Sequence, residues 1–191
     1  MKTFLRRAVT PFAVFSLTAL GLAACGDRDK ASVAIDTPAS SSRTLGTEVK
    51  GAADLSDLRS LVENAGLEAV LDGTGPYTVF APLNSAFAAS GGVGDLSGPG
   101  MRAQGAALIR AHIVPGALSR RDIGAAIDGA SDGSAQMRTM AGGLLTFTRA
   151  GQSLVVTAED GATARLTAGE TVAGNGMLQP VDAVLVKAAP G

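Results

Sequence analysis

The sequence has little of what metal sites and many catalytic sites require. Its 191 residues include one cysteine, one histidine and no tryptophan. One cysteine cannot form an intramolecular disulfide, and one cysteine with one histidine falls short of the several nitrogen or sulfur ligands of a stable zinc site. The sequence therefore predicts no metal and no cofactor.

An excess of positive charge is missing as well. Lys and Arg number 16 and Asp and Glu number 17, so the formal net charge is −1. Proteins that bind nucleic acid neutralise phosphates with clustered basic residues, so no nucleic-acid partner is expected. Aromatic residues beyond position 24 are limited to Tyr77, Phe80, Phe87 and Phe147. Stacking platforms for bases or sugars are therefore not expected.

The N-terminal segment has the layout of a signal peptide. Lys2, Arg6 and Arg7 precede an apolar run over residues 8–24, which ends in small residues. This run is short for a membrane span, which needs about 20 apolar residues, and no later segment approaches that length. We expect removal of residues 1–24 and no transmembrane helix afterwards.

The sequence Leu-Ala-Ala-Cys at residues 22–25 resembles the bacterial lipobox. The resemblance implies that Cys25 becomes the acylated N-terminus, with palmitate as one such acyl chain, and attaches the protein to a membrane. Gly26 offers no acidic signal for retention in the inner membrane, which favours the outer membrane, facing the periplasm or the surface. The alternatives are a conventional cleavage site or an uncleaved anchor.

Residues 25–50 are predicted to be a flexible tether. They are rich in charged residues, Ser, Thr and Ala, and they include Pro38 without a sustained apolar period. The remainder, residues 51–191, is predicted to form one domain.

Within that domain, helices are expected early and strands late. A helix is predicted over residues 54–65, with Asp54 as N-cap and Gly66 as its stop. Further helices are expected at residues 67–71, 84–90, 101–110 and 119–127, and strands at 77–81, 112–114, 136–140, 144–148, 154–157, 164–166 and 177–186. Ser119, with Asp122 three residues later, matches a capping box at the start of the last helix. This order predicts an α+β fold with a single domain.

Three segments together resemble the fasciclin domain family. They are TVFAPLNSAF at residues 78–87, AHIVPGAL at 111–118 and NGMLQPVDAVL at 175–185. The resemblance covers about residues 54–187, and its motif positions here are Thr78, Phe80, Pro82, Asn84, Phe87, Gly176 and Asp182. It implies a wedge-shaped β-sheet core with several short helices. It also implies an extracytoplasmic cell-adhesion or ligand-binding module without catalysis.

The sequence departs from the family pattern at two places. Ala111 stands where the family often has a tyrosine linked to adhesion-receptor binding. Pro180 has no backbone N–H, which favours an edge strand or a bulge at that point. Asn84 is expected to cap the helix that follows Pro82.

His112 is the one conventional general base that the sequence offers. The competing interpretation is structural, with the imidazole bonded to a backbone carbonyl or to Asp182. Residues 129–133 match the string G-x-S-x-G, which in hydrolases presents a nucleophilic serine between a strand and a helix. Here a helix precedes Ser131, strands follow it, and the histidine comes earlier in the chain, so a turn is predicted.

Arg120 and Arg121 form a small positive spot on a chain whose formal net charge, after loss of residues 1–24, is −4. They are candidates to contact an acidic partner, and the alternative is an ordinary solvated helix face. With His112, they are the predicted binding residues.

The sequence therefore predicts a lipid-anchored envelope protein that binds a protein or polysaccharide without catalysis. Two alternatives stay open. One is a carrier of a small apolar ligand, which requires an apolar cavity of a few hundred cubic ångströms. The other is an envelope hydrolase that depends on His112.

Overall fold

The computed structural model describes residues 41–91, 96, 98, 100–167 and 169–187, all within one compact unit, Thr37–Gly191. The predicted signal peptide, Cys25 and residues 26–40 lie outside the described residues. Helices and two four-stranded sheets make up this unit, which confirms the expected α+β class.

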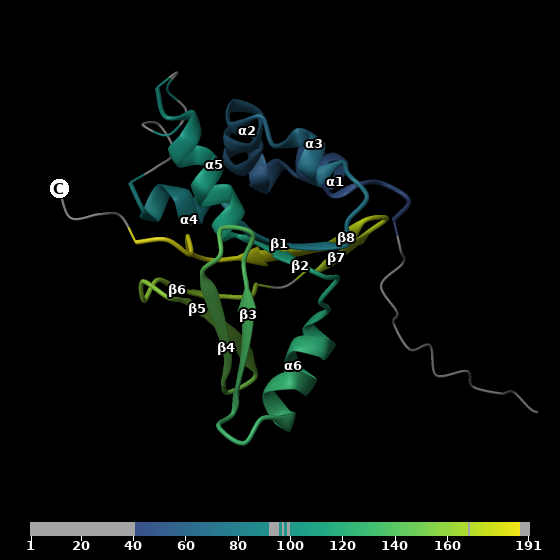
Figure 1. The fold of residues 1–191 in the computed structure, drawn as a ribbon, viewed down its shortest axis with the longest axis vertical. Helices are drawn as coiled ribbons and strands as arrows, with labels where there is room; N and C mark the ends of the chain where they lie inside the picture. The colour runs from purple at the N-terminus through teal and green to yellow at the C-terminus, as the bar shows by residue number, and fades with distance from the viewer. Residues whose placement is uncertain (1–40, 92–95, 97, 99, 168, 188–191) are drawn as a thin grey trace, which may run out of the picture. The chain divides into compact units, whose positions relative to one another are not determined.

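The first sheet, sheet A, has the strand order β2-β1-β8-β7. Its strands are β1 (Tyr77–Pro82), β2 (Ile113–Pro115), β7 (Thr171–Ala173) and β8 (Gly176–Val181). β1 pairs with β2 in antiparallel and with β8 in parallel orientation, so segments about a hundred residues apart in the chain lie side by side (Figure 1).

Strand β1 is buried on both of its faces. Val79 and Ala81 belong to one hydrophobic cluster, whereas Phe80 belongs to another. Since successive side chains of a strand point to opposite faces, sheet A separates two cores. A run of apolar residues without alternation is what such a doubly covered strand requires.

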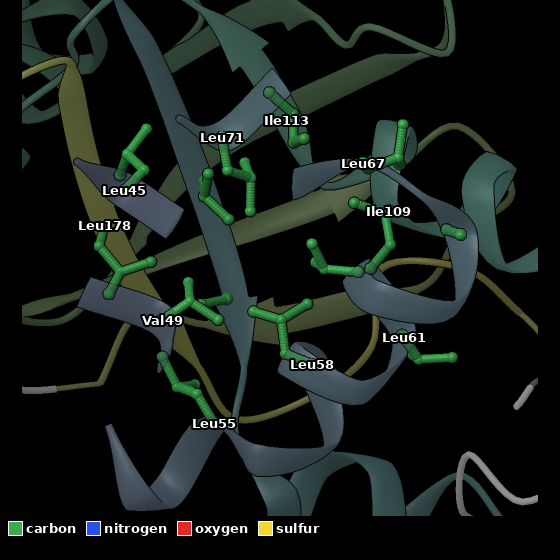
Figure 2. Packing of buried hydrophobic residues seen from close by; sticks show 14 of the residues in the cluster. Leu45, Val49, Leu55, Leu58, Leu61, Leu67, Leu71, Ile109, Ile113 and Leu178 are labelled. Atoms are coloured by element: carbon green, nitrogen blue, oxygen red, sulfur yellow. The ribbon is translucent and has the colours of Figure 1, made fainter. Parts of the chain in front are cut away.

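Helices cover one face of sheet A. They are α1 (Leu45–Gly51), α2 (Ser56–Ala65), α3 (Glu68–Leu71), α4 (Asn84–Ala89) and α5 (Arg102–Ala111), with a short 3₁₀ helix at Ala53–Leu55. Figure 2 shows how Leu58 and Leu61 of α2 and Ile109 of α5 point into the same apolar cluster. Burial of this cluster fixes the helices on the sheet.

The opposite face of sheet A packs against a second sheet and helix α6 (Arg120–Gly129). This second sheet, sheet B, has the order β3-β4-β5-β6, with strands β3 (Ser134–Arg138), β4 (Leu144–Ala150), β5 (Ser153–Ala158) and β6 (Thr163–Arg165). The rings of Phe80 and Phe147 meet here with centroids 5.2 Å apart. In Figure 1, α6 lies beside β3 and β4.

The predicted end of the tether, residue 50, is wrong. Residues 41–50 belong to the folded unit, because α1 inserts Leu45, which is fully buried, and Val49 into the helical core. The backbone N–H of Ser41 also donates to Val172 of the edge strand β7 at 2.9 Å. The apolar period in this segment is too short to stand out from its polar neighbours in the sequence.

The C-terminal cap of α2 agrees with the prediction, whereas the N-terminal caps predicted from Asp54 and Asn84 do not. Gly66 ends α2 in the left-handed conformation with φ 68°, as expected. Asp54, however, lies in the 3₁₀ helix, and the N-terminus of α2 is capped from afar: Asn84 Oδ1 accepts from the backbone N–H of Asp57 at 3.1 Å. The prediction that Asn84 caps the helix after Pro82 is therefore wrong: Asn84 caps α2, and α4 has no side-chain cap.

Pro180 lies in an interior strand, which corrects the expectation of an edge strand. Strand β8 runs between β1 and β7, but β7 pairs only with Gly176, Met177 and Leu178. The Pro180 carbonyl accepts from the N–H of Thr167 at 2.9 Å instead. The proline therefore follows the end of the β7 ladder, where a missing N–H interrupts no pairing with that strand. β8 also ends at Val181, well before the predicted residue 186.

Candidate functional site

His112 lies in the interior and joins two segments of backbone. Its side chain is 1% exposed; Nδ1 bonds to the Leu108 carbonyl at 2.8 Å, and Nε2 accepts from the Leu185 N–H at 2.9 Å. Because the carbonyl can only accept, these bonds require the neutral imidazole with its proton on Nδ1. Burial lowers the pKa of His112 to about 4.

This geometry favours the structural interpretation of His112. Both ring nitrogens are bonded to backbone, so neither is free to take a proton from a serine or to contact a ligand. Asp182, the alternative partner considered from the sequence, accepts instead from the backbone N–H of Arg165 at 2.6 Å. Ser131 lies in the turn between α6 and β3, the helix–turn–strand order that the sequence predicted.

The motif residues of the 78–87 segment are architectural. Thr78 is fully buried, and its hydroxyl donates to the Gly116 carbonyl at 2.6 Å while accepting from the Leu118 N–H at 2.8 Å. Phe80 and Phe87 are buried in the two different clusters. Pro82 ends β1 in a buried position.

Gly176 is required at the start of β8 because a side chain there would meet backbone. A Cβ at this position would overlap the carbonyl oxygen of Tyr77 and approach Leu45 to 2.9 Å. Tyr77 and Gly176 are paired across β1 and β8. The motif glycine therefore allows the close approach of the two parallel strands.

Arg120 is less exposed than the sequence suggested. It is half-buried at the first residue of α6, after the predicted capping box of Ser119 and Asp122, which the structure confirms. Its Nε donates to the amide oxygen of Gln179 at 3.0 Å, and its Nη2 is buried without a hydrogen-bond partner among the described residues. Burial lowers the pKa of Arg120, and the nearby negative charge of Glu170 partly opposes this shift.

Gln179 holds Arg120 in place and is itself fully buried. Its amide nitrogen donates to the Leu118 carbonyl at 3.0 Å and to Glu170 Oε2 at 2.8 Å. The same carboxylate oxygen accepts from the backbone N–H of Arg120 at 2.9 Å. A fully satisfied amide thus fixes the start of α6 against β8.

Arg120 and Arg121 line a pocket together with Arg149 of β4. Its remaining lining residues are Gln152, Ser153, Leu154 and Leu166, and its volume is about 430 Å³. Arg121 is exposed. The positive spot predicted on α6 is therefore one wall of a larger cationic pocket.

Arg149 reaches across α6 to make a two-pronged ion pair. Its Nε and Nη2 each donate to the carboxylate of Asp128 at 2.8 Å. Gly124 gives the side chain room, because a Cβ on Gly124 would lie 2.6 Å from Arg149 Nη2. The glycine inside the helix thereby allows the guanidinium to lie against the helix backbone.

The pocket could not be predicted from the sequence, because its lining residues come from α6, β4, the turn that follows β4, the start of β5 and the residue after β6. The one signal in the sequence was Gln179, a polar residue within an otherwise apolar strand, which indicates a buried polar partner such as Arg120. A second pocket, lined in part by Val49, Val62 and Leu71, holds about 10 Å³, close to the space of one water. Neither pocket is the apolar cavity that a carrier of an apolar ligand would need.

Among the residues that the structure describes, no group of three or more His, Cys, Asp or Glu side chains is placed to hold a metal ion. No helix in this part of the chain has the length and apolar character needed to cross a membrane.

The comparisons with known proteins identify the class to which this architecture belongs. The model of the fasciclin domain matches residues 53–187. The chain therefore belongs to the fasciclin domain family. This family is generally non-catalytic and is known for adhesion-related modules.

Relatives of known sequence and structure agree with this assignment. Protein sll1483 of Synechocystis sp. is 28% identical over 181 residues, which cover 94% of this chain and 92% of that protein. Human Stabilin-1 is 44% identical over 50 residues, 26% of this chain but 2% of Stabilin-1. The structure of a FAS1 domain pair from the insect cell adhesion molecule Fasciclin I superposes with a TM-score of 0.55 at 22% identity, over 70% of this chain and 46% of that one. This likeness shows a shared fold.

Proposed function

We propose that this protein is an extracytoplasmic binding module that acts at the cell envelope without catalysis. The observation that carries the proposal is the match of the fasciclin domain to residues 53–187, which is nearly the whole described fold. The resemblance of the fold to a domain pair from a cell adhesion molecule supports it. The burial of His112, with both ring nitrogens bonded to backbone, removes the reason to prefer a hydrolase.

The membrane attachment belongs to the same proposal. It rests on the signal-peptide layout of residues 1–24 and the lipobox-like sequence that ends at Cys25. The residues that follow Cys25 would then link the folded unit to its lipid anchor in the outer membrane. Mass spectrometry of the protein from cells should find Cys25 acylated and residues 1–24 absent. Recovery of the intact N-terminus would refute the anchor, and Cys25→Ser should release the protein from the membrane fraction.

The partner is expected to be a protein or polysaccharide that carries acidic groups. Arg121 is the exposed contact residue, and Arg120 lies behind it on the same helix. Charged residues at the rim of an interface mainly affect association and its dependence on salt. Partner binding should therefore weaken as ionic strength rises.

A capture experiment tests the proposal. The chain from Gly26 onward is immobilised and incubated with envelope extract, and bound protein and polysaccharide are identified. Arg121→Glu should reduce capture several-fold, because it reverses the charge of the exposed contact. Arg165→Glu is the matched control, since Arg165 is also exposed but lies on β6 beside Val155, on the face of sheet B opposite Leu154. If no protein or polysaccharide is captured above background, the binding function is rejected.

A further inference from the structure

The pocket between α6 and the β4–β5 hairpin combines cationic walls with an apolar floor. Arg120, Arg121 and Arg149 are its cationic lining residues, and Leu154 and Leu166 are its apolar lining residues. No Asp or Glu is among its lining residues. Its volume of about 430 Å³ lies in the usual range of small-ligand sites and exceeds what a lone inorganic anion needs.

The three arginines differ in the number of hydrogen bonds and ion pairs that their guanidinium groups already make. Arg149 uses two of its nitrogens on Asp128. Arg120 donates through Nε to a neutral amide, and its Nη2 is buried and unpartnered within the described part of the chain. Arg121 is exposed. In the described ranges, no carboxylate oxygen lies within 4.0 Å of a guanidinium nitrogen of Arg120 or Arg121.

The acidic residues near Arg120 already accept hydrogen bonds from other groups. Glu170 is occupied by the backbone N–H of Arg120 and by the Gln179 amide. Asp122 accepts from the Ser119 hydroxyl at 2.6 Å within the capping box. The residues that line the pocket itself are all positive or neutral.

We propose that this pocket binds an amphiphilic anion, a phosphate or carboxylate group attached to a short hydrocarbon. Guanidinium groups present paired donors that match the oxygens of phosphate and carboxylate. A hydrocarbon portion would cover Leu154 and Leu166 and so gain from burial of apolar surface. A neutral sugar is a poorer fit, because no aromatic residue lines the pocket. Two sources share this chemistry, a soluble amphiphilic anion and the headgroup region of a membrane lipid.

This inference names a ligand chemistry for the proposed binding module and rests on that proposed function. Its test uses small probes of known structure, so it can fail while envelope capture succeeds. Conversely, probe binding without any envelope capture would uphold the pocket and reject the adhesion-type role.

Titration of the chain from Gly26 onward with three probes tests the ligand class. Octyl phosphate has both features, inorganic phosphate has only the head, and octyl glucoside has the same tail with a neutral head. Calorimetry or NMR at low salt should show saturable binding of octyl phosphate, at least tenfold tighter than that of inorganic phosphate. Binding of octyl phosphate should weaken with added salt. No saturable binding of octyl phosphate, or equal binding of octyl glucoside, would overturn the proposal.

Variants locate the binding. Arg121→Glu and, separately, Arg120→Gln should each weaken octyl phosphate binding at least tenfold, and Arg165→Glu should leave it unchanged. Arg121 is exposed, so its variant is expected to fold even if Arg120→Gln disturbs the contact with Gln179. Thermal unfolding checks that each variant is folded. Equal affinity of wild type and Arg121→Glu would overturn the assignment to this pocket.

Vesicles separate the two sources of the anion. Flotation of the chain with phosphatidylglycerol vesicles but not with phosphatidylcholine vesicles, lost in Arg121→Glu, would identify a lipid headgroup. Octyl phosphate binding without flotation would identify a soluble amphiphile. Failure of both would contradict the proposal.

Discussion

At the scale of single residues, buried polar side chains join segments that lie far apart in the sequence. Thr78 connects β1 to the loop before α6 through two hydrogen bonds. His112 connects the end of α5 to the chain after β8. Each side chain replaces hydrogen bonds that backbone groups would otherwise make with water, so each is predicted to matter for stability.

Thr78→Val should destabilise the protein by about 1–3 kcal/mol. The substitution keeps the shape of the side chain but leaves the Gly116 carbonyl and the Leu118 N–H without their partner. Urea unfolding measures the change, and Thr78→Ser, which keeps the hydroxyl, should lose less. A Thr78→Val protein as stable as wild type would show that these hydrogen bonds contribute nothing net.

His112 should make the protein less stable as the pH falls from about 6.5 to about 4. Burial lowers its pKa in the folded state to about 4, whereas the unfolded chain titrates near 6.5. The unfolded state therefore binds more protons in this window, and the stability present above pH 6.5 is lost progressively by about 3 kcal/mol. Denaturant unfolding at several pH values measures the slope.

The matched variant for this pH dependence is His112→Gln, which can offer an acceptor but does not titrate. Carboxylates with lowered pKa values, such as that of Asp122, add to the loss of stability in acid, and they do so equally in both proteins. The difference between the two curves therefore isolates the imidazole. Parallel curves between pH 4 and 6.5 would contradict the buried neutral histidine.

The structural role of His112 and its bond to a backbone carbonyl could be anticipated from the sequence, but its second partner could not. A lone histidine between a helix and an apolar strand favours a buried, bonded imidazole. The second partner of the imidazole depends on the path of the chain after β8. There the Leu185 N–H donates to Nε2, whereas Asp182, the partner considered from the sequence, accepts from the Arg165 N–H.

At the scale of elements, local signals predicted well and long-range ones did not. The capping box of Ser119 and Asp122 acts within four residues, and the structure confirms it. The cap of α2 comes from Asn84, 27 residues beyond Asp57, and no local pattern could reveal it. For the same reason the sequence did not place Arg149 with Arg120 and Arg121, because β4 and α6 come together only in the tertiary fold.

Asn84→Ala should lower the free energy of unfolding by about 1–2 kcal/mol. It removes the acceptor for the Asp57 N–H and the donor to the Ala53 carbonyl and to Ser56 Oγ. The adjacent exposed substitution Ser85→Ala is the control and should change stability by less than about 0.5 kcal/mol. Equal effects of the two substitutions in chemical denaturation would argue against the long-range cap.

At the scale of the whole molecule, sheet A organises the fold by separating two cores, and residues 41–50 complete one of them. The α+β class and the family could be predicted, since the motif segments form β1, β2 and β8, which are neighbours in sheet A. The start of the folded unit could not, because α1 is short and is stabilised by packing more than by its own sequence.

A chain that begins at residue 51 should be less stable than one that begins at residue 41. It loses the burial of Leu45 and Val49, each worth about 1.5–3 kcal/mol. Thermal and urea unfolding of the two chains measure the difference, expected to be at least about 3 kcal/mol. Equal stability of the two chains would support residue 50 as the end of the tether.

Attachment of beads to immobilised envelope material tests the central claim, that this fasciclin domain is a binding module with its contact at the arginine pocket. Beads carry the chain from Gly26 onward as wild type, Arg121→Glu or Arg165→Glu, and retention is counted under flow at two salt concentrations. Wild type and Arg165→Glu should be retained equally and Arg121→Glu several-fold less, with retention falling as salt rises. Retention no greater than that of uncoated beads would contradict the binding function, and equal retention of all three proteins would contradict the site.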